Sequence, residues 1–291
     1  MTSISERTNK PARGIGLMIL GCAFLMMSDA VSKWLSQTYP VGQIMCLRNV
    51  FVLVPILFVV WRSGRFADLR IGNWGGQFLR GGFHVLAAAL FVTSVSLLPL
   101  ADVHAIGFVG PIFIAALSPF LLKEHVGWRR WTAILVGFAG VLVMLRPTGA
   151  GFHYLGLIPV AAALSSALRD IATRHLSRDQ TSISILLFSS SMVIIVGLFT
   201  APFGWQALTL QSTALFALNG FVNGSAHFLI IESYRNAQAP IVAPFKYSML
   251  LWATLFGFLI WNQLPDAWII GGTVPLIGSG LYIFYREQRF K

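Results

Sequence analysis

Long blocks of apolar residues follow one another along this chain, separated by short polar stretches. The blocks lack the spacing of amphipathic helices or strands, and each approaches the roughly 20 residues that a helix needs to cross a bilayer. The pattern therefore predicts an all-α integral membrane protein with ten transmembrane helices and no appended soluble domain. The predicted spans are Gly14–Ser36, Val41–Trp61, Gly75–Leu97, Leu100–Leu122, Trp128–Leu145, Tyr154–Thr173, Thr181–Ala201, Ser212–Tyr234, Ile241–Trp261 and Ala267–Tyr285.

Composition agrees with this pattern. Of the 291 residues, 56% are hydrophobic and only 11% are charged, whereas a soluble domain carries about 25% charged residues. A chain with so little charge cannot cover a water-facing surface, which favours a protein surrounded by lipid.

The distribution of the basic residues decides how the formal net charge of +11 is interpreted. With the N-terminus in the cytoplasm, fifteen Lys and Arg residues fall in inside segments and only Arg146 falls in an outside segment. This asymmetry follows the positive-inside rule, so the basicity reflects topology and does not predict a nucleic-acid partner. We expect a multi-pass protein of the inner (plasma) membrane, with the lipid bilayer as its surroundings and both termini in the cytoplasm. The fifteen inside residues are Arg7, Lys10, Arg13, Arg62, Arg65, Arg70, Lys123, Arg129, Arg130, Arg174, Arg178, Arg235, Arg286, Arg289 and Lys291.

An internal repeat relates the two halves of the chain. The stretch "SDAVSKWLS" at residues 28–36 resembles "RDIATRHLS" at residues 169–177, and a shift of 141 residues aligns Asp29 with Asp170. A shift of 138 residues aligns further positions, including Gly140 with Gly278. The halves are therefore interpreted as copies of one unit.

The repeat predicts two domains of five helices each, residues 1–147 and 148–291. Because five is odd, the second copy enters the membrane inverted relative to the first. Many secondary transporters have inverted repeats with the working site at their interface, since exchanging the conformations of the two halves converts an outward opening into an inward one. The alternative is shared ancestry of helical hairpins without alternating access.

Several stretches resemble the drug/metabolite transporter superfamily, specifically its ten-span EamA type. They are "LRNVFVLVP" in the second predicted span, "LPLADVHAIGFVGPIFIAALSPFLLKEHVGWRRWTAILVGFAGVLVMLRP" across the fourth and fifth, and "APFKYSMLLWATLFGFLIWNQLPDAWIIGGTVPLIGSGLYI" near the C-terminus. The resemblance covers essentially the whole chain and implies a ten-span fold that transports a small organic molecule. The family has a Gly-Glu pair after the fourth span. Here Lys123-Glu124 keeps the Glu, and Asn262 replaces the acid in the second copy.

The resemblance also indicates the kind of substrate. The fourth-span pattern is similar to EamA-type subgroups that take up riboflavin or S-adenosylmethionine, which makes riboflavin uptake the first expectation. The alternatives are transport or export of an amino acid or a nucleoside-like metabolite, and a non-transporting role as a membrane receptor or assembly component. An interior with bases, amides and many of the 23 Phe rings suits a planar heteroaromatic with polar edges.

The motifs of other functional classes are missing from the sequence. No G-x-x-x-x-G-K-[ST] occurs, so ATP is not expected to drive transport. The serine run at residues 189–191 lacks a neighbouring His or acid at a useful spacing, and His84 and His227 lack further ligands for a metal, so we expect neither an enzyme nor a cofactor. A homodimer is compatible with the sequence. A further hypothesis is that transport is coupled to protons, which Asp29, Asp170 and Glu232 could carry in step with the substrate.

Charged residues inside the first two predicted spans form the first group of candidate substrate-binding residues. Asp29 and Lys33 are four residues apart on one helix face, where they can neutralise one another or face the substrate. Arg48 lies about two turns into the second span, which begins on the side of the membrane where the first span ends. Asp102 and His104 begin the fourth span at that level and would complete a polar cluster.

The second group lies in the third, eighth and ninth predicted spans. Lys246 and Tyr247 follow Pro244 in the ninth span, and Lys246 is expected either to bind substrate or to pair with Glu232. His84 lies in the third span. The eighth carries a stripe of Asn219, Asn223 and His227 at a spacing of four, either a cavity wall or contacts that hold helices together. The candidate set is Asp29, Lys33, Arg48, His84, Asn223, His227, Lys246 and Tyr247.

Overall fold

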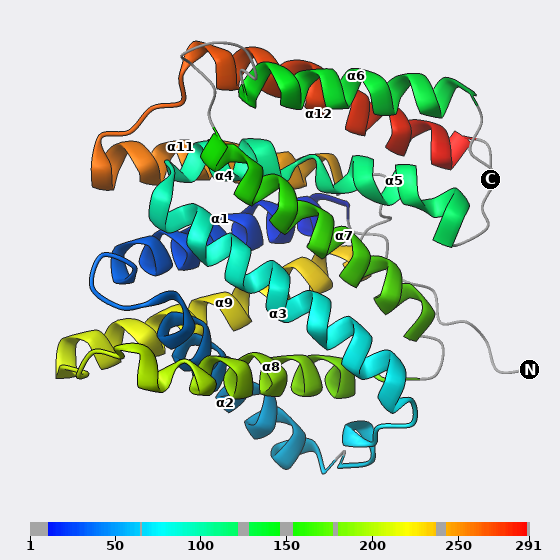
Figure 1. Cartoon of the computed structure of the whole chain (residues 1–291). Coiled ribbons are helices and arrows are strands. Elements are labelled where there is room, and N and C mark those ends of the chain that lie inside the picture. Colours follow the sequence, from blue (N-terminus) through cyan, green and yellow to red (C-terminus); the bar gives the residue numbers. More distant parts are fainter. Residues whose placement is uncertain are drawn as a thin grey trace, which may run out of the picture.

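The computed structural model describes residues 11–64, 66–121, 128–145, 154–176, 180–236 and 243–289. Every regular element within these ranges is helical (Figure 1), which confirms the all-α fold class for this part of the chain. The helices are α1 (Pro11–Leu35), α2 (Val41–Ser63), α3 (Trp74–Leu97), α4 (Leu100–Gly107), α5 (Gly110–Leu121), α6 (Trp128–Leu145), α7 (Leu157–Leu176), α8 (Ser182–Phe199), α9 (Leu210–Asn236), α11 (Ser248–Trp261) and α12 (Ala267–Arg289). Short 3₁₀ turns are η1 (Phe66–Leu69), η3 (Tyr154–Gly156), η4 (Ala201–Phe203) and η5 (Ala243–Tyr247).

The helices follow the predicted spans closely except in the ninth, where α11 begins only at Ser248 after the turn η5, and in the fourth. The prediction of one continuous helix over Leu100–Leu122 is wrong, because α4 ends at Gly107 and α5 begins at Gly110. Pro111 explains the break, since proline lacks a backbone N–H and disfavours the helical conformation in the residue before it. The junction instead has short-range bonds from the amide of Phe108 to the carbonyl of Ala105 (3.3 Å) and from Val109 to Ile106 (3.1 Å).

Three described stretches are long and apolar enough to cross a bilayer, judged by length and composition: Ala12–Leu35, Trp74–Leu97 and Tyr154–Thr173. Further apolar stretches of 10–17 residues lie in α2, α4–α5, α6, α8, α11 and α12. The prediction of ten spans therefore stays a prediction.

The distribution of polar and apolar side chains is reversed relative to a soluble protein. Large apolar side chains lie on the outside, including Leu251, which is 73% exposed, and Phe58. Charged and amide groups lie inside, including Asp29, Arg80 and the fully buried Asn219. In a water-soluble protein charged side chains are almost never buried, so this arrangement indicates an exterior solvated by lipid.

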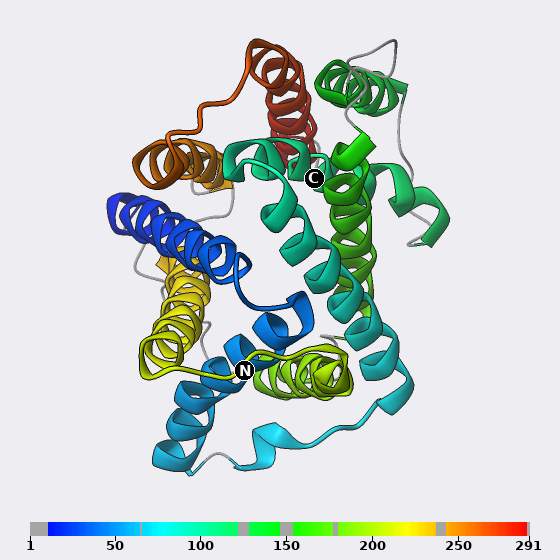
Figure 2. The same ribbon diagram turned by 60° about the vertical axis from the view of Figure 1, so that its left-hand side comes forward.

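The main helix contacts join the first half of the chain to the second. In both views α1 lies between α9 and α11, and α3 runs beside α7 (Figures 1 and 2). Likewise α2 packs on α8 and α9, and α6 packs on α12. The two halves therefore share their interior rather than forming separate cores, and α1 begins and α12 ends on the same side of the molecule (Figure 1).

Candidate functional site

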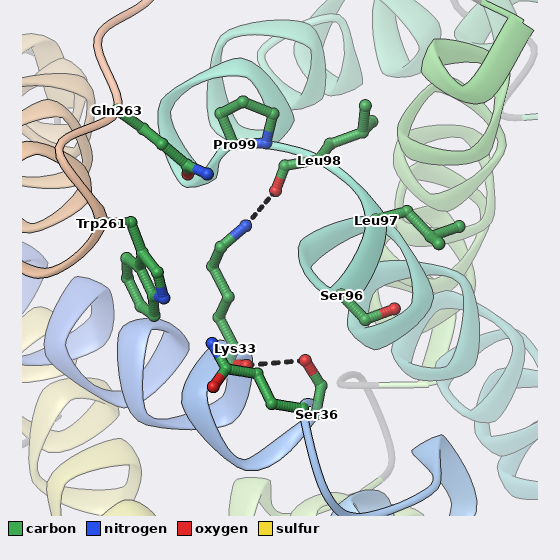
Figure 3. Close-up of a pocket in the computed structure, with 9 residues that line it drawn as sticks. Lys33, Ser36, Ser96, Leu97, Leu98, Pro99, Trp261 and Gln263 are labelled. Carbon is green, nitrogen blue, oxygen red and sulfur yellow. Dashed lines mark hydrogen bonds between the residues drawn. The ribbon is translucent and has the colours of Figure 1, made fainter.

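A pocket of about 250 Å³, here called the Lys33 pocket, opens where the end of α1 meets the α3–α4 junction and the end of α11 (Figure 3). Polar side chains from three separate helices or their connections contribute to its wall. The lining residues are Lys33, Ser36, Gln37, Ser96, Leu97, Leu98, Pro99, Trp261 and Gln263.

The ammonium group of Lys33 is held by the C-terminal end of α3. It donates hydrogen bonds to the carbonyl oxygen of Val95, at 3.1 Å, and to that of Leu98 (Figure 3), and it lies 5.4 Å from the centre of the Trp261 ring. The last carbonyls of a helix have no partner within it and carry partial negative charge, so a cation there is stabilised. Lys33 is therefore bound to backbone carbonyls and not paired with Asp29 as the sequence suggested.

Asp29 is instead paired with His104. The Asp29 carboxylate lies 3.2 Å from Nε2 of His104, and the imidazole packs edge-on against Phe91 with ring centres 5.6 Å apart. The charge of Arg48 also acts on Asp29. The structure thus brings Asp29, Arg48 and His104 together, as the sequence suggested, while Lys33 of the same predicted cluster is bound to backbone carbonyls.

A hydrogen-bond network joins α1 to α9 beside this pair. Ser28 donates to the side-chain oxygen of Asn219 (2.6 Å), Asn219 donates to Ser32 (2.9 Å), and Asn223 donates to Ser28 (3.1 Å). Asn219 is fully buried, so it serves as a contact between helices. Asn223 is half-buried, and His227, one turn further along α9, is exposed. The stripe therefore makes helix contacts at Asn219 and Asn223, and its end at His227 is exposed.

Four basic side chains come together from four different elements, and we call them the basic cluster. They are Arg48 on α2, His84 on α3, His227 on α9 and Lys246 in η5. The charges of Arg48 and Lys246 both act on the His227 imidazole, and those of Arg48 and His227 act on His84. Lys246 also acts on Cys22, in the buried core of α1.

No side chain of the basic cluster has a hydrogen bond or ion pair to another group within the described ranges. The Lys246 and His227 side chains are exposed, and those of Arg48 and His84 are half-buried. Lys246 and His227 are therefore accessible, whereas Nδ1 of His84 is buried without a hydrogen-bond partner in the described part of the chain. The expected pairing of Lys246 with Glu232 is not seen among the described contacts.

Two further arginines, Arg80 and Arg169, differ in their burial and partners. Arg80 is buried and donates to Thr173 on α7, at 2.9 Å, and to Ser189 on α8. Arg169 forms a two-point contact with Asp170, at 2.8 and 2.9 Å, and its charge acts on both His84 and His227. Sequence reasoning missed the closeness of Arg169 to the candidate site, although its place beside the repeated charged stretch was an available signal.

Aromatic rings lie next to the basic cluster. The Tyr247 ring packs on Phe108, with ring centres 4.9 Å apart, and Phe108 occupies the break between α4 and α5. The broken helix thus places an aromatic pair beside Lys246. In the described ranges no three His, Cys, Asp or Glu side chains are arranged to hold a metal ion.

An apolar exterior around a polar helical interior defines an integral membrane protein, and part of the chain matches the model of a known family. Residues 12–146 match the model of the EamA-like transporter family. The chain thus carries an EamA domain of the drug/metabolite transporter superfamily, which confirms the resemblance noted in the sequence.

Similar proteins of known name are transporters. The chain is 27% identical over 277 residues to an S-adenosylmethionine uptake transporter of Rickettsia bellii, covering 95% of this chain and 94% of the relative. It is 25% identical over 284 residues to a riboflavin transporter of Vibrio cholerae, covering 96% and 95%. A pseudopaline exporter of Pseudomonas aeruginosa is 22% identical over 271 residues, covering 91% and 93%.

A solved structure shares the fold. This crystal structure, described only as that of a protein, superposes with a TM-score of 0.63 at 17% identity and covers 94% of this chain and 99% of its own. At this identity the likeness concerns architecture alone.

Proposed function

We propose that this protein is a secondary transporter that moves a small organic metabolite across the inner membrane by alternating access. In this proposal ten spans form two inverted five-helix domains, residues 1–147 and 148–291, with both termini in the cytoplasm. The substrate binds between the domains, in contact with members of the set Asp29, Lys33, Arg48, His84, Asn223, His227, Lys246 and Tyr247.

The pattern of helix contacts carries this proposal. If the halves are copies, α1, α2, α3, α4–α5 and α6 correspond to α7, α8, α9, α11 and α12. The contact of α1 with α9 then corresponds to that of α3 with α7, and the contact of α2 with α9 to that of α3 with α8. The contact of α1 with α11 likewise corresponds to the contacts of α7 with α4 and α5. Exchanging the halves turns the contact of α2 with α8 into itself, and the same holds for the contact of α6 with α12. The largest contacts are thus matched when the halves are exchanged, which is what alternating access between inverted repeats requires.

The substrate proposed is a metabolite with a planar heteroaromatic group. Both riboflavin, the first expectation from the sequence, and S-adenosylmethionine contain such a group, and transporters of each kind are similar to nearly the whole chain. The Tyr247–Phe108 ring pair beside the basic cluster supports a heteroaromatic ligand, because rings can pack on its faces while polar groups bind its edges.

Uptake into proteoliposomes tests the proposal. Purified protein reconstituted into lipid vesicles should accumulate radiolabelled S-adenosylmethionine or riboflavin faster than protein-free vesicles, without ATP. Repeating the assay with and without an imposed pH gradient tests proton coupling, for which the Asp29–His104 pair is the candidate group. If either compound binds the purified protein but neither enters the vesicles, the transporter proposal fails and the receptor alternative is favoured.

A further inference from the structure

Three helices end at the Lys33 pocket: α1 at Leu35, α3 at Leu97 and α11 at Trp261. In Figure 1 the ends of α1 and α11 lie opposite the start of α1 and the end of α12. With both termini in the cytoplasm, as proposed, the pocket is on the outer side of the membrane. The contacts around Lys33 therefore decide whether these three helices are joined or separated at the outer end.

Lys33 joins the three helix ends through its ammonium group. It donates to the carbonyl oxygen of Val95, at 3.1 Å, and to that of Leu98, and both of these residues lie at the end of α3. On its other side the centre of the Trp261 ring is 5.4 Å away, and that ring also packs against Trp34 of α1, with ring centres 6.4 Å apart. Since α1 and α3 belong to the first half of the chain and α11 to the second, one side chain connects the two halves here.

Two polar atoms beside Lys33 have no partner in this arrangement. Nε1 of Trp261 and Oε1 of Gln263 are buried, and neither has a hydrogen bond within the described part of the chain. A buried polar atom without a partner is costly, and separation of the helices would expose both atoms to water. The bonds of Lys33 therefore favour the joined arrangement, while the two unpartnered atoms favour separation. Opposed contributions of comparable size allow a contact to change between two states.

The contact of α1 with α3 has no counterpart of comparable extent in the other half of the described chain. Exchanging the halves turns this contact into one between α7 and α9, and those two helices do not pack on one another to the same extent within the described ranges. The largest contacts are matched between the halves, whereas this smaller one is not. An inverted-repeat transporter that is closed on one side has such an asymmetry between its two ends.

We propose that Lys33 holds an outer gate closed. Its bonds to the end of α3 and its contact with Trp261 keep the outer ends of α1, α3 and α11 together, and release of its ammonium group into water allows them to separate. Separation would open a path to the Asp29–His104 pair, because Asp29 lies one turn deeper on α1. This inference rests on the proposed function, since it assigns a means of opening to the same transport pathway.

Thiol labelling of intact cells tests the gate. Ala101→Cys places a thiol near the start of α4, where Ala101 is 2% exposed and belongs to the same buried core as Leu98. A membrane-impermeant maleimide added outside should label this thiol slowly while Lys33 is present. After Lys33→Met the labelling should be about tenfold faster or more, because hydrogen bonds from a charged group are lost. Lys33→Arg keeps a cationic donor, so its labelling should stay slow.

A second variant should change the rate in the opposite direction. Gln263→Met removes the unpartnered oxygen at similar side-chain size, so the joined arrangement should become more favourable and labelling of Ala101→Cys should slow. Equal labelling rates with Lys33 and with folded Lys33→Met overturn the inference. If Lys33→Met does not fold, Gln263→Met decides: slower labelling supports the gate, and an equal or faster rate overturns it.

Two controls separate opening of the gate from a general loss of structure. Lys33→Met protein without the introduced thiol retains the buried Cys22 and Cys46, and these should label no faster than in the wild type. Faster labelling of these native cysteines would show general unfolding and contradict a local gate. Phe203→Cys in η4 is the matched accessible site, because Phe203 is 82% exposed on the proposed outer side. It should label rapidly and at the same rate with Lys33 and with Lys33→Met.

The two proposals fail in different ways. A chain that moves solute into vesicles but labels equally with Lys33 and with Lys33→Met refutes the gate and leaves the transporter standing. A chain that labels faster after Lys33→Met but moves no solute refutes the transporter and leaves an outer end that Lys33 holds closed.

Discussion

Lys33 illustrates how a single cation is accommodated deep in this membrane protein. Its side chain is only 7% exposed, and its ammonium group uses the free carbonyls at the end of α3 and the face of the Trp261 ring. A cation near a helix C-terminus is favoured by the helix dipole, and an aromatic face adds a cation–π contribution. Lys33 thereby ties α1 to the α3–α4 junction and to α11.

Substitution of Lys33 should destabilise the protein. Lys33→Met removes the charge but keeps most of the length, so the carbonyls of Val95 and Leu98 lose their donor. We expect the free energy of unfolding to fall by about 1.5–3 kcal/mol, the usual range for hydrogen bonds to a charged group. Thermal unfolding of purified protein in detergent measures the effect, with Lys33→Arg expected to lose less. Equal unfolding temperatures for wild type and Lys33→Met would show that these bonds contribute nothing.

At the scale of elements, the contact of α6 with α12 shows how closely the halves approach. A Cβ atom at Gly140 would lie 2.6 Å from the carbonyl oxygen of Gly272, and one at Gly272 would lie 2.5 Å from Cγ of Met144. Real Cβ atoms essentially never come so close to other atoms, so both positions need glycine for this helix separation. Small residues at interfaces permit such packing in membranes, where the apolar lipid gives helices no hydrophobic reason to associate.

A pair of neighbouring glycines in α12 isolates this effect. Gly272→Ala should force α12 away from α6 and destabilise the protein by about 1–3 kcal/mol, as overpacking does. Gly271→Ala is the matched control, because a Cβ atom there meets nothing within 4 Å. Alanine also has the higher helix propensity, so Gly271→Ala should be neutral or mildly stabilising. Unfolding temperatures in detergent compare the two, and equal values would rule out the proposed close contact.

At the scale of the whole molecule, two features are those expected of inverted repeats: the largest helix contacts are matched between the halves, and the chain ends lie on one side. The start of α1 and the end of α12 lie on one side in Figure 1, which is the arrangement that ten predicted crossings require. By the positive-inside rule, the fifteen basic residues in the segments assigned to the inside predict that this side faces the cytoplasm.

Reporter fusions test this topology. A fusion at Gly64, after α2, should report the cytoplasm, and one at Phe203, after α8, should report the outer side. Both positions are exposed in connections between helices, so insertion there should be tolerated. An outer signal at Gly64 would overturn the charge-based orientation and the inverted arrangement of the repeats together.

The sequence by itself determined the helical class, the approximate limits of the helices and the candidate bases. Hydropathy and helix-breaking residues act over short stretches of chain, so those features can be read locally. The break before Pro111 was missed although its signal is local, because the apolar block around it is continuous.

Only the tertiary structure decided which polar groups meet. Asp29 and Lys33 are neighbours on one helix face, yet Asp29 pairs with His104 and Lys33 with the end of α3. Spacing along a helix shows that two side chains can meet, but not whether a better partner lies on another helix. Arg80 likewise bonds to α7 and α8, whereas Lys246 keeps an accessible ammonium group with no described partner. These outcomes depend on contacts between residues that are distant in sequence, which fix the distances and directions that electrostatic interactions and hydrogen bonds require.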